Sequence, residues 1–180
     1  YENRILGEFV VPYIVGVGCT PFKKHTDQSF RDLARLAVTA SLNDAQCHRK
    51  PKLIFFGNCA MHAFGQANIR GQTALMPMLA NQTLAPRTPI INVEAGCATG
   101  GVAFHCAVQA LKSNDFSMAV GVEKLIFEND PKLLKSFPLF TDGIDKKHKD
   151  EWMAFYNEQS QKHNVPFSPH PYRVIFIDIH

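Results

Sequence analysis

The chain has 180 residues, of which 46% are hydrophobic and 19% are charged, and its net charge is +3. This length and balance fit one sizeable globular domain, or most of one, and they exclude a disordered chain. The weak positive charge is interspersed with acidic residues and argues against nucleic acid as a partner. No apolar run approaches the length of a membrane span.

Short apolar runs alternate with helical patterns over the first two thirds of the chain. The predicted strands are Tyr13–Gly18, Leu53–Gly57, Ile90–Val93 and Phe116–Val122. The predicted helices are one that begins at Phe30 with Asp27 or Ser29 as its N-cap, Ile69–Gln82 with Pro77 as a kink or a new start, and Ala98–Ser113. Strands separated by helices imply βαβ crossovers. The sequence therefore predicts an α/β fold with a mainly parallel sheet and helices on both faces.

The composition changes after Lys124, where Lys, Asp, Glu, His and Pro become frequent. The predicted features of this part are an amphipathic helix over Asp145–Lys162 with Trp152, Phe155 and Tyr156 on its apolar side, an extended loop over Asn164–Tyr172, and an apolar run over Val174–Ile179. We expect a continuation of the chain to bury that last run. The sequence thus predicts a domain over residues 1–125 and part of a second one over residues 126–180.

Cys97 lies between the predicted strand Ile90–Val93 and the helix that begins at Ala98. A thiol at a tight turn before a helix experiences the positive end of the helix dipole and nearby backbone N–H groups, which favour the thiolate. A thiolate is the form that attacks acyl groups. The main hypothesis for Cys97 is therefore a catalytic nucleophile, and the alternative is a buried structural thiol in a close-packed turn.

Two other uses of this turn fit the sequence less well. A phosphate-binding loop would show GxGxxG or a P-loop Lys-Ser/Thr pair, and neither is present. The nucleophile elbow of an α/β-hydrolase would place Gly two residues before and after the nucleophile, where this chain has Ala95 and Thr99.

The remaining candidate residues have weaker signals. The five cysteines are irregularly spaced, which favours a reducing intracellular compartment, and the lack of a CxxC pair argues against a metal site. Cysteines other than Cys97 are expected to act as small hydrophobic residues. His62 is expected in a solvated loop or at the border of a pocket, His105 on a helix surface, and Glu94 in a hydrogen-bonded structural role. The basic run 146–149 predicts either a solvated helix face or a site for the phosphates of coenzyme A.

Several stretches together resemble the thiolase superfamily, and especially the sterol-carrier-protein-2-type thiolases and their thiolase-like relatives. They are Val15–Phe22, Ser29–Leu33, Gly57–Asn58, Gly65–Gln66, Ile69–Leu75, Cys97–Gly101 and Val120–Lys124. The resemblance covers about residues 13–125 and implies that the chain is the N-terminal half of a thiolase-like fold. Residues 126–180 would then begin the inserted loop domain that covers the acyl-CoA site.

The resemblance implies acyl transfer between a cysteine and coenzyme A, as 3-ketoacyl-CoA cleavage or the reverse condensation. Cys97 would accept the acyl group, and its backbone N–H would be one donor of the oxyanion hole. Acyl-CoA would be a substrate, with no covalently bound cofactor, and the other catalytic motifs would come from segments beyond residue 180. A homodimer is implied, in a mitochondrial or peroxisomal matrix or in a cytoplasm.

Two alternatives remain at this point. The first is a non-catalytic thiolase-like protein that binds acyl-CoA, lipid or a partner subunit. The second is another branch of the superfamily, such as a ketoacyl synthase or a hydroxymethylglutaryl-CoA synthase, which the Cys97–Gly100 signature and the long charged loop disfavour.

Overall fold

A three-stranded parallel sheet forms the centre of the first part of the chain in the computed structural model, which describes residues 11–124 and 146–164. The strands are β1 (Leu53–Gly57), β2 (Ile90–Val93) and β3 (Ser117–Gly121), in the order β2-β1-β3. These strands confirm three of the four predicted ones and the parallel arrangement. Because the strands are parallel, their carboxyl ends lie at one edge of the sheet.

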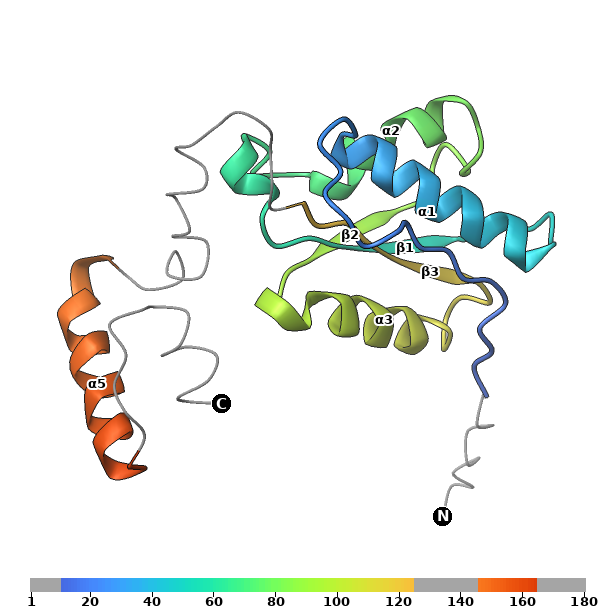
Figure 1. Cartoon of the computed structure of the whole chain (residues 1–180). Coiled ribbons are helices and arrows are strands. Elements are labelled where there is room, and N and C mark those ends of the chain that lie inside the picture. The colour runs from blue at the N-terminus through green and yellow to red at the C-terminus, as the bar shows by residue number, and fades with distance from the viewer. Residues whose placement is uncertain (1–10, 125–145, 165–180) are drawn as a thin grey trace, which may run out of the picture. The chain divides into compact units, whose positions relative to one another are not determined.

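Helices cover both faces of this sheet, as the alternating pattern predicted. They are α1 (Phe30–Ala45), α2 (Arg70–Ala80) and α3 (Thr99–Ala110). Figure 1 shows α1 and α2 on one face and α3 on the other. Pro77 lies within α2, so the helix does not restart there.

The two faces bury different side chains. On the α1 and α2 face, large residues from the strands and helices form the main core, among them Ile54, Phe56, Leu75, Met78 and Val120. On the α3 face, the buried cluster consists of Phe55, Ala103 and Ala107. Successive residues of β1 therefore alternate between the two cores, as a period of two in a strand requires.

The start of α1 is fixed by a capping box. The Ser29 hydroxyl accepts a hydrogen bond from the Asp32 backbone N–H at 3.2 Å, and the Asp32 carboxylate accepts one from the Ser29 N–H at 3.0 Å. Two donors at the helix start are satisfied by this exchange. Of the two predicted N-caps, the structure thus selects Ser29.

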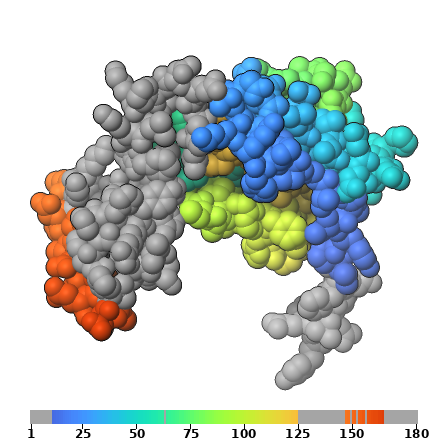
Figure 2. All heavy atoms as spheres, in the orientation of Figure 1, coloured from blue at the N-terminus to red at the C-terminus, as the bar shows by residue number. Residues whose placement is uncertain are grey.

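The prediction of a strand at Tyr13–Gly18 is wrong. Residues 11–20 form no strand and instead lie along α1, with which they form a continuous blue surface in Figure 2. The Val17 N–H donates to the Asp44 carboxylate at 2.8 Å, and the Ser41 hydroxyl donates to the Gly16 carbonyl at 3.1 Å. A Cβ at Gly16 would lie 2.3 Å from the Ser41 carbonyl oxygen, so this approach requires glycine. The apolar run has strand character, but two of its backbone groups form hydrogen bonds with side chains of α1.

The chain divides into two compact units, residues 1–126 and 127–180. In the second unit, the described residues form a short 3₁₀ turn, η4 (Lys146–His148), and α5 (Lys149–Lys162). This confirms most of the predicted helix over Asp145–Lys162, and Phe155 is 45% exposed on it. The predictions for 165–172 and Val174–Ile179 lie outside the described residues. In the part of the chain that is described, no helix has the length and apolarity needed to cross a membrane.

Candidate functional site

The loops that follow the three strands meet at one edge of the sheet, which we call the carboxyl edge. Gly57, the last residue of β1, pairs with Val93 of β2 and with Gly121 of β3. The N–H of Asn58 continues the ladder by donating to the Val93 carbonyl at 3.3 Å. The chemically relevant residues of these loops are Cys59, Glu94, Cys97 and Glu123.

Cys97 occupies a short 3₁₀ turn, η2 (Gly96–Ala98), between β2 and α3. The Glu94 carboxylate accepts a hydrogen bond from the Gly96 N–H at 2.6 Å, and the Thr99 hydroxyl donates to the Gly96 carbonyl at 2.6 Å. Glu94 therefore has the hydrogen-bonded structural role that was predicted. The Cys97 side chain is exposed, which argues against the alternative of a buried structural thiol.

A close approach between β1 and α3 brings this turn near the loop after β1. A Cβ at Gly57 would lie 3.0 Å from Thr99 Cγ2 and 3.4 Å from the Thr99 carbonyl oxygen. Thr99 is buried, so the first residue of α3 packs directly over the end of β1. Cys97, two residues before Thr99, is thereby held at the same end of the sheet as Cys59.

The loop that carries Cys59 is fixed by Glu123, which follows β3. The Glu123 carboxylate accepts hydrogen bonds from the N–H groups of Cys59 at 2.8 Å and Ala60 at 3.2 Å, and from Asn58 Nδ2 at 3.1 Å. Asn58 is 2% exposed, and its Oδ1 accepts a bond from the Met61 N–H at 2.8 Å. These bonds satisfy the polar groups of a tight loop and determine the direction of the chain at Cys59.

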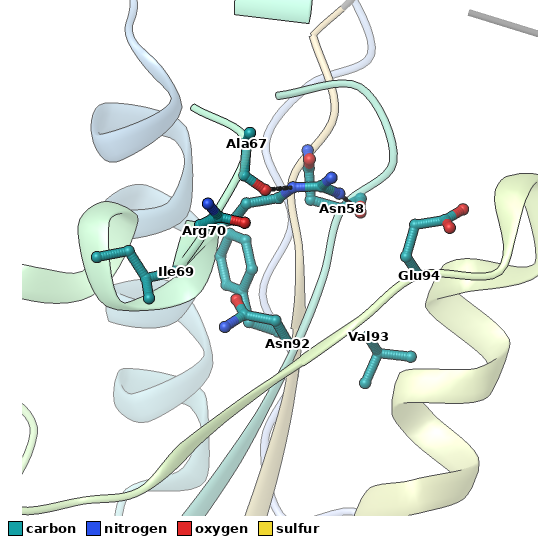
Figure 3. A pocket seen from close by; sticks show the side chains of 9 residues that line it. Asn58, Ala67, Ile69, Arg70, Asn92, Val93 and Glu94 are labelled. Carbon is teal, nitrogen blue, oxygen red and sulfur yellow. Dashed lines mark hydrogen bonds between the residues drawn. The ribbon is translucent and has the colours of Figure 1, made fainter. Parts of the chain in front are cut away.

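Arg70, the first residue of α2, supports the same loop from another side. Its Nη1 donates to the Asn58 carbonyl at 2.8 Å, and its Nε donates to the Ala67 carbonyl at 3.1 Å. A pocket of about 270 Å³ lies beside these groups. Figure 3 shows the Arg70 side chain directed toward Asn58 and the Glu94 side chain directed away from Asn58. The Arg70 guanidinium is thus bonded to backbone carbonyls, which favours a supporting role for this residue.

Cys59 lies among negatively charged groups. Burial raises the pKa of the Cys59 thiol above its ordinary value, and the Glu94 and Glu123 carboxylates raise it further. The Glu94 carboxylate also hydrogen-bonds the Cys59 thiol, which favours its protonated form. A charge on Cys97 raises the pKa of the Cys59 thiol as well, as the last of these causes.

Cys59 is the residue of this edge that sequence reasoning missed. It was expected to be a small hydrophobic residue, but it is only half-buried and contacts two carboxylates. The available signal was its position directly after the strand Leu53–Gly57, because residues that follow parallel strands share one edge.

The two histidine candidates have different positions. His62 is half-buried in a short 3₁₀ turn, η1 (Met61–Phe64), and its Nδ1 donates to the Cys59 carbonyl at 2.9 Å, so it lies at the carboxyl edge and not in a solvated loop. His105 is exposed on α3, as predicted. Across residues 11–124 and 146–164, no cluster of three or more His, Cys, Asp or Glu side chains could hold a metal ion.

Comparison with known proteins identifies relatives of this chain. No family model matches it. It is 30% identical over 144 residues to the acetyl-CoA acetyltransferase of Methanothermobacter thermautotrophicus, and the aligned segment covers 78% of this chain and 34% of that protein. It is 34% identical over 116 residues to the benzoylsuccinyl-CoA thiolase subunit BbsB of Thauera aromatica, which covers 62% of this chain and 27% of the relative. It is 33% identical over 118 residues to sterol carrier protein 2 of Homo sapiens, which covers 63% of this chain and 20% of the relative.

A parallel α/β unit with an exposed cysteine in a strand-to-helix turn thus occurs in a chain related to acyl-CoA enzymes. The chain is a distant homologue of thiolases and of the thiolase domain of sterol carrier protein 2. It spans about a third of the length of the acetyltransferase and less of the other two relatives.

Proposed function

We propose that the protein is a CoA-dependent acyltransferase of thiolase type in which Cys97 accepts the acyl group as a thioester. The observation that carries the proposal is the exposed Cys97 thiol in the turn between β2 and α3, within a chain homologous to thiolases. The parallel sheet with helices on both faces supports a thiolase-like fold for residues 11–124.

The proposed reaction begins with attack of Cys97 Sγ on the 3-keto carbonyl of a 3-ketoacyl-CoA. Cleavage of the carbon–carbon bond leaves the acyl group on Cys97 and releases the fragment that carries coenzyme A, whose carbanion takes up the proton that the Cys97 thiol lost. The thiol of a second coenzyme A then takes the acyl group from Cys97, and the reverse sequence is the condensation. The Cys97 N–H is proposed as one donor to the oxyanion that forms in each addition.

Coenzyme A is a substrate in this proposal, and residues 126–180 are proposed to begin the loop domain that covers it. The first unit provides the nucleophile. The remaining acid, base and oxyanion groups are assigned to segments of the complete protein outside this sequence.

The test is acyl transfer to Cys97 in the complete protein. After incubation with acetyl-CoA and an acid quench, peptide mass spectrometry should find one acetyl group on the Cys97 peptide, and free coenzyme A should appear in equal amount. Cys97→Ala should abolish both, whereas Cys106→Ala, a matched control on α3, should retain both. A Cys97→Ala protein that still forms acyl-CoA product would exclude the proposed nucleophile. Binding of acyl-CoA without acylation of Cys97 would support the non-catalytic alternative.

A homodimer through the edge strand β2 is part of the proposal. Among the described strands, β2 pairs with β1 alone, and Ile91 on it is 46% exposed. A free strand edge beside exposed apolar surface can pair with a second copy. Size-exclusion chromatography with light scattering should give the mass of a dimer at micromolar concentration, and a monomer alone would contradict this part.

A further inference from the structure

Two thiols from segments far apart in the sequence lie in neighbouring loops of the carboxyl edge, and the proposed acyl transfer uses only one of them. Cys59 follows β1, and Cys97 follows the neighbouring strand β2. The hydrogen bond from the Asn58 N–H to the Val93 carbonyl holds the ends of these strands together at 3.3 Å. From the other side, Thr99 packs on Gly57, with 3.0 Å between Thr99 Cγ2 and the position of a Gly57 Cβ. Cys59 is two residues after Gly57, and Cys97 is two residues before Thr99. Both cysteines are therefore adjacent in sequence to this contact.

Glu94 connects the two thiols. Its carboxylate accepts the Gly96 N–H at 2.6 Å, in the turn of Cys97, and it also hydrogen-bonds the Cys59 thiol. A carboxylate in this place can receive the Cys59 proton when that sulfur reacts. It also keeps Cys59 in the thiol form until then, whereas Cys97 is the exposed thiol of the pair.

The two glycines that flank Cys97 in its turn are not closely packed. A Cβ built on Gly96 or on Gly100 would meet no atom within 4 Å. A disulfide requires Cα atoms about 4.4–6.8 Å apart and a defined geometry at the two sulfurs. The space at these two positions leaves the glycines on either side of Cys97 without packed neighbours, and the disulfide requires η2 to shift against its hydrogen bonds to Glu94 and Thr99.

We propose that Cys59 is the resolving thiol for Cys97, so that a peroxide converts the pair into an intramolecular disulfide. This inference concerns oxidation of the two thiols and does not depend on the proposed acyl transfer. The ligand class is a hydroperoxide, with hydrogen peroxide as the simplest member.

The reaction has two balanced steps. In the first, the Cys97 thiolate attacks one oxygen of the peroxide, the O–O bond breaks, and hydroxide leaves. Cys97 is thereby oxidised by two electrons to a sulfenic acid while the peroxide is reduced. In the second, the Cys59 proton passes to the Glu94 carboxylate, and the Cys59 sulfur attacks Cys97 Sγ. The S–O bond breaks as hydroxide leaves, and with the proton from Glu94 it becomes water.

The disulfide would block the proposed acyl acceptor and at the same time protect it. A sulfenic acid without a nearby thiol is oxidised further to sulfinic acid, which thiol reductants do not reverse. A disulfide with Cys59 returns to two thiols on treatment with dithiothreitol. The pair would thus make inactivation by peroxide reversible.

The experiment maps the disulfide in the full 180-residue chain. The reduced chain is treated with one equivalent of hydrogen peroxide, free thiols are blocked with iodoacetamide, and the protein is digested without reduction for mass spectrometry. We expect a linked peptide that contains Cys59 and Cys97 as the dominant disulfide, and its loss after dithiothreitol. Dominant pairing of Cys97 with another cysteine, or no disulfide at all, would overturn the proposal.

A matched pair of variants tests the role of Cys59. Cys59→Ser should abolish the linked peptide and raise the sulfinic acid on Cys97 severalfold, whereas Cys106→Ser should leave the link unchanged. Equal amounts of sulfinic acid in the Cys59→Ser and wild-type chains would contradict a resolving role. Circular dichroism establishes that the variants are folded, and if Cys59→Ser is not, the peptide map of the wild-type chain decides the question alone. A positive map with no acylation of Cys97 would refute the proposed function while leaving this proposal intact.

Discussion

The helices on the two faces of the sheet bury side chains of different size. The α1 and α2 face buries large residues, with Ile54, Phe56 and Leu75 fully inaccessible to solvent at 0% exposure. The α3 face buries alanines from the helix, Ala103 and Ala107, against the sheet. Large buried side chains contribute most of the hydrophobic stabilisation, about 1.5–3 kcal/mol each. Small ones allow two backbones to approach closely.

Because of this difference, we expect one face to determine the stability of the unit and the other to determine the positions of Cys59 and Cys97. The Cys97 turn belongs to the α3 face, where Thr99 packs over Gly57. A large side chain at that contact would hold the start of α3 away from β1 and would move Cys97 away from Cys59. The α1 and α2 face is therefore expected to determine how stable the unit is, and the α3 face is expected to determine where its thiols lie.

The largest expected effect is loss of a core side chain on the α1 and α2 face. Phe56→Ala should reduce the free energy of unfolding by about 3–5 kcal/mol, because it removes a buried ring and leaves a cavity. Urea unfolding followed by circular dichroism measures this change. Phe22→Ala is the control, because Phe22 is 101% exposed and should cost little. Similar losses in both variants would contradict the assignment of the core.

The next effect tests the close approach on the α3 face. Gly57→Ala should reduce the free energy of unfolding by about 1–3 kcal/mol through overpacking against Thr99. It should also lower the yield of the disulfide between Cys59 and Cys97. Gly121→Ala, at the paired position of β3, is the matched control, because its Cβ would lie 3.6 Å from the nearest atom, the Gly57 carbonyl oxygen. If Gly121→Ala has the larger effect on the disulfide, the contact with Thr99 does not position Cys97.

The N-cap of α1 should contribute less to the free energy of unfolding than the buried core residues do. Ser29→Ala should cost about 1 kcal/mol, whereas Asp27→Ala, at the other predicted N-cap, should cost less. The hydrogen bonds from Ser29 hold the pKa of Asp32 below its ordinary value of 3.8. This contribution is present above pH 3.8 and is lost as the pH falls through the lowered pKa of the folded chain. Urea unfolding across this pH range should show a weaker acid dependence in Ser29→Ala, and an unchanged one would contradict the capping box.

The smallest effect concerns reactivity at the carboxyl edge. Because burial and the nearby carboxylates raise its pKa, Cys59 should be alkylated by iodoacetamide with a midpoint above pH 9.0, the ordinary value for a thiol. Glu94→Gln should lower that midpoint, since it removes a negative charge but retains an acceptor for the Gly96 N–H. Burial is the largest cause, so only part of the shift should disappear. Cys106 in the same digests is the internal reference, and an equal change at both cysteines would rule out a specific effect of Glu94.

The local elements of the fold could be predicted because their signals are local. The apolar runs at Leu53–Gly57 and Ile90–Val93 and the helical spacing after Phe30 depend on neighbouring residues, and the structure confirms them. The run Tyr13–Gly18 has the same strand-like composition, and its failure shows that composition does not determine the hydrogen-bond partner. That partner is α1, through Ser41 and Asp44.

The sequence by itself determined the α/β class and the place of Cys97 directly after a strand, because both depend on the order of short apolar runs along the chain. Only the tertiary structure decided which other groups share an edge of the sheet with that cysteine. Cys59 and Glu123 come from distant segments, and the parallel register of β1 with β2 and β3 brings them to the carboxyl edge. The hydrogen bonds of Glu123 and the packing of Thr99 on Gly57 then fix the loops there, because buried polar groups and close-packed backbones allow few other arrangements.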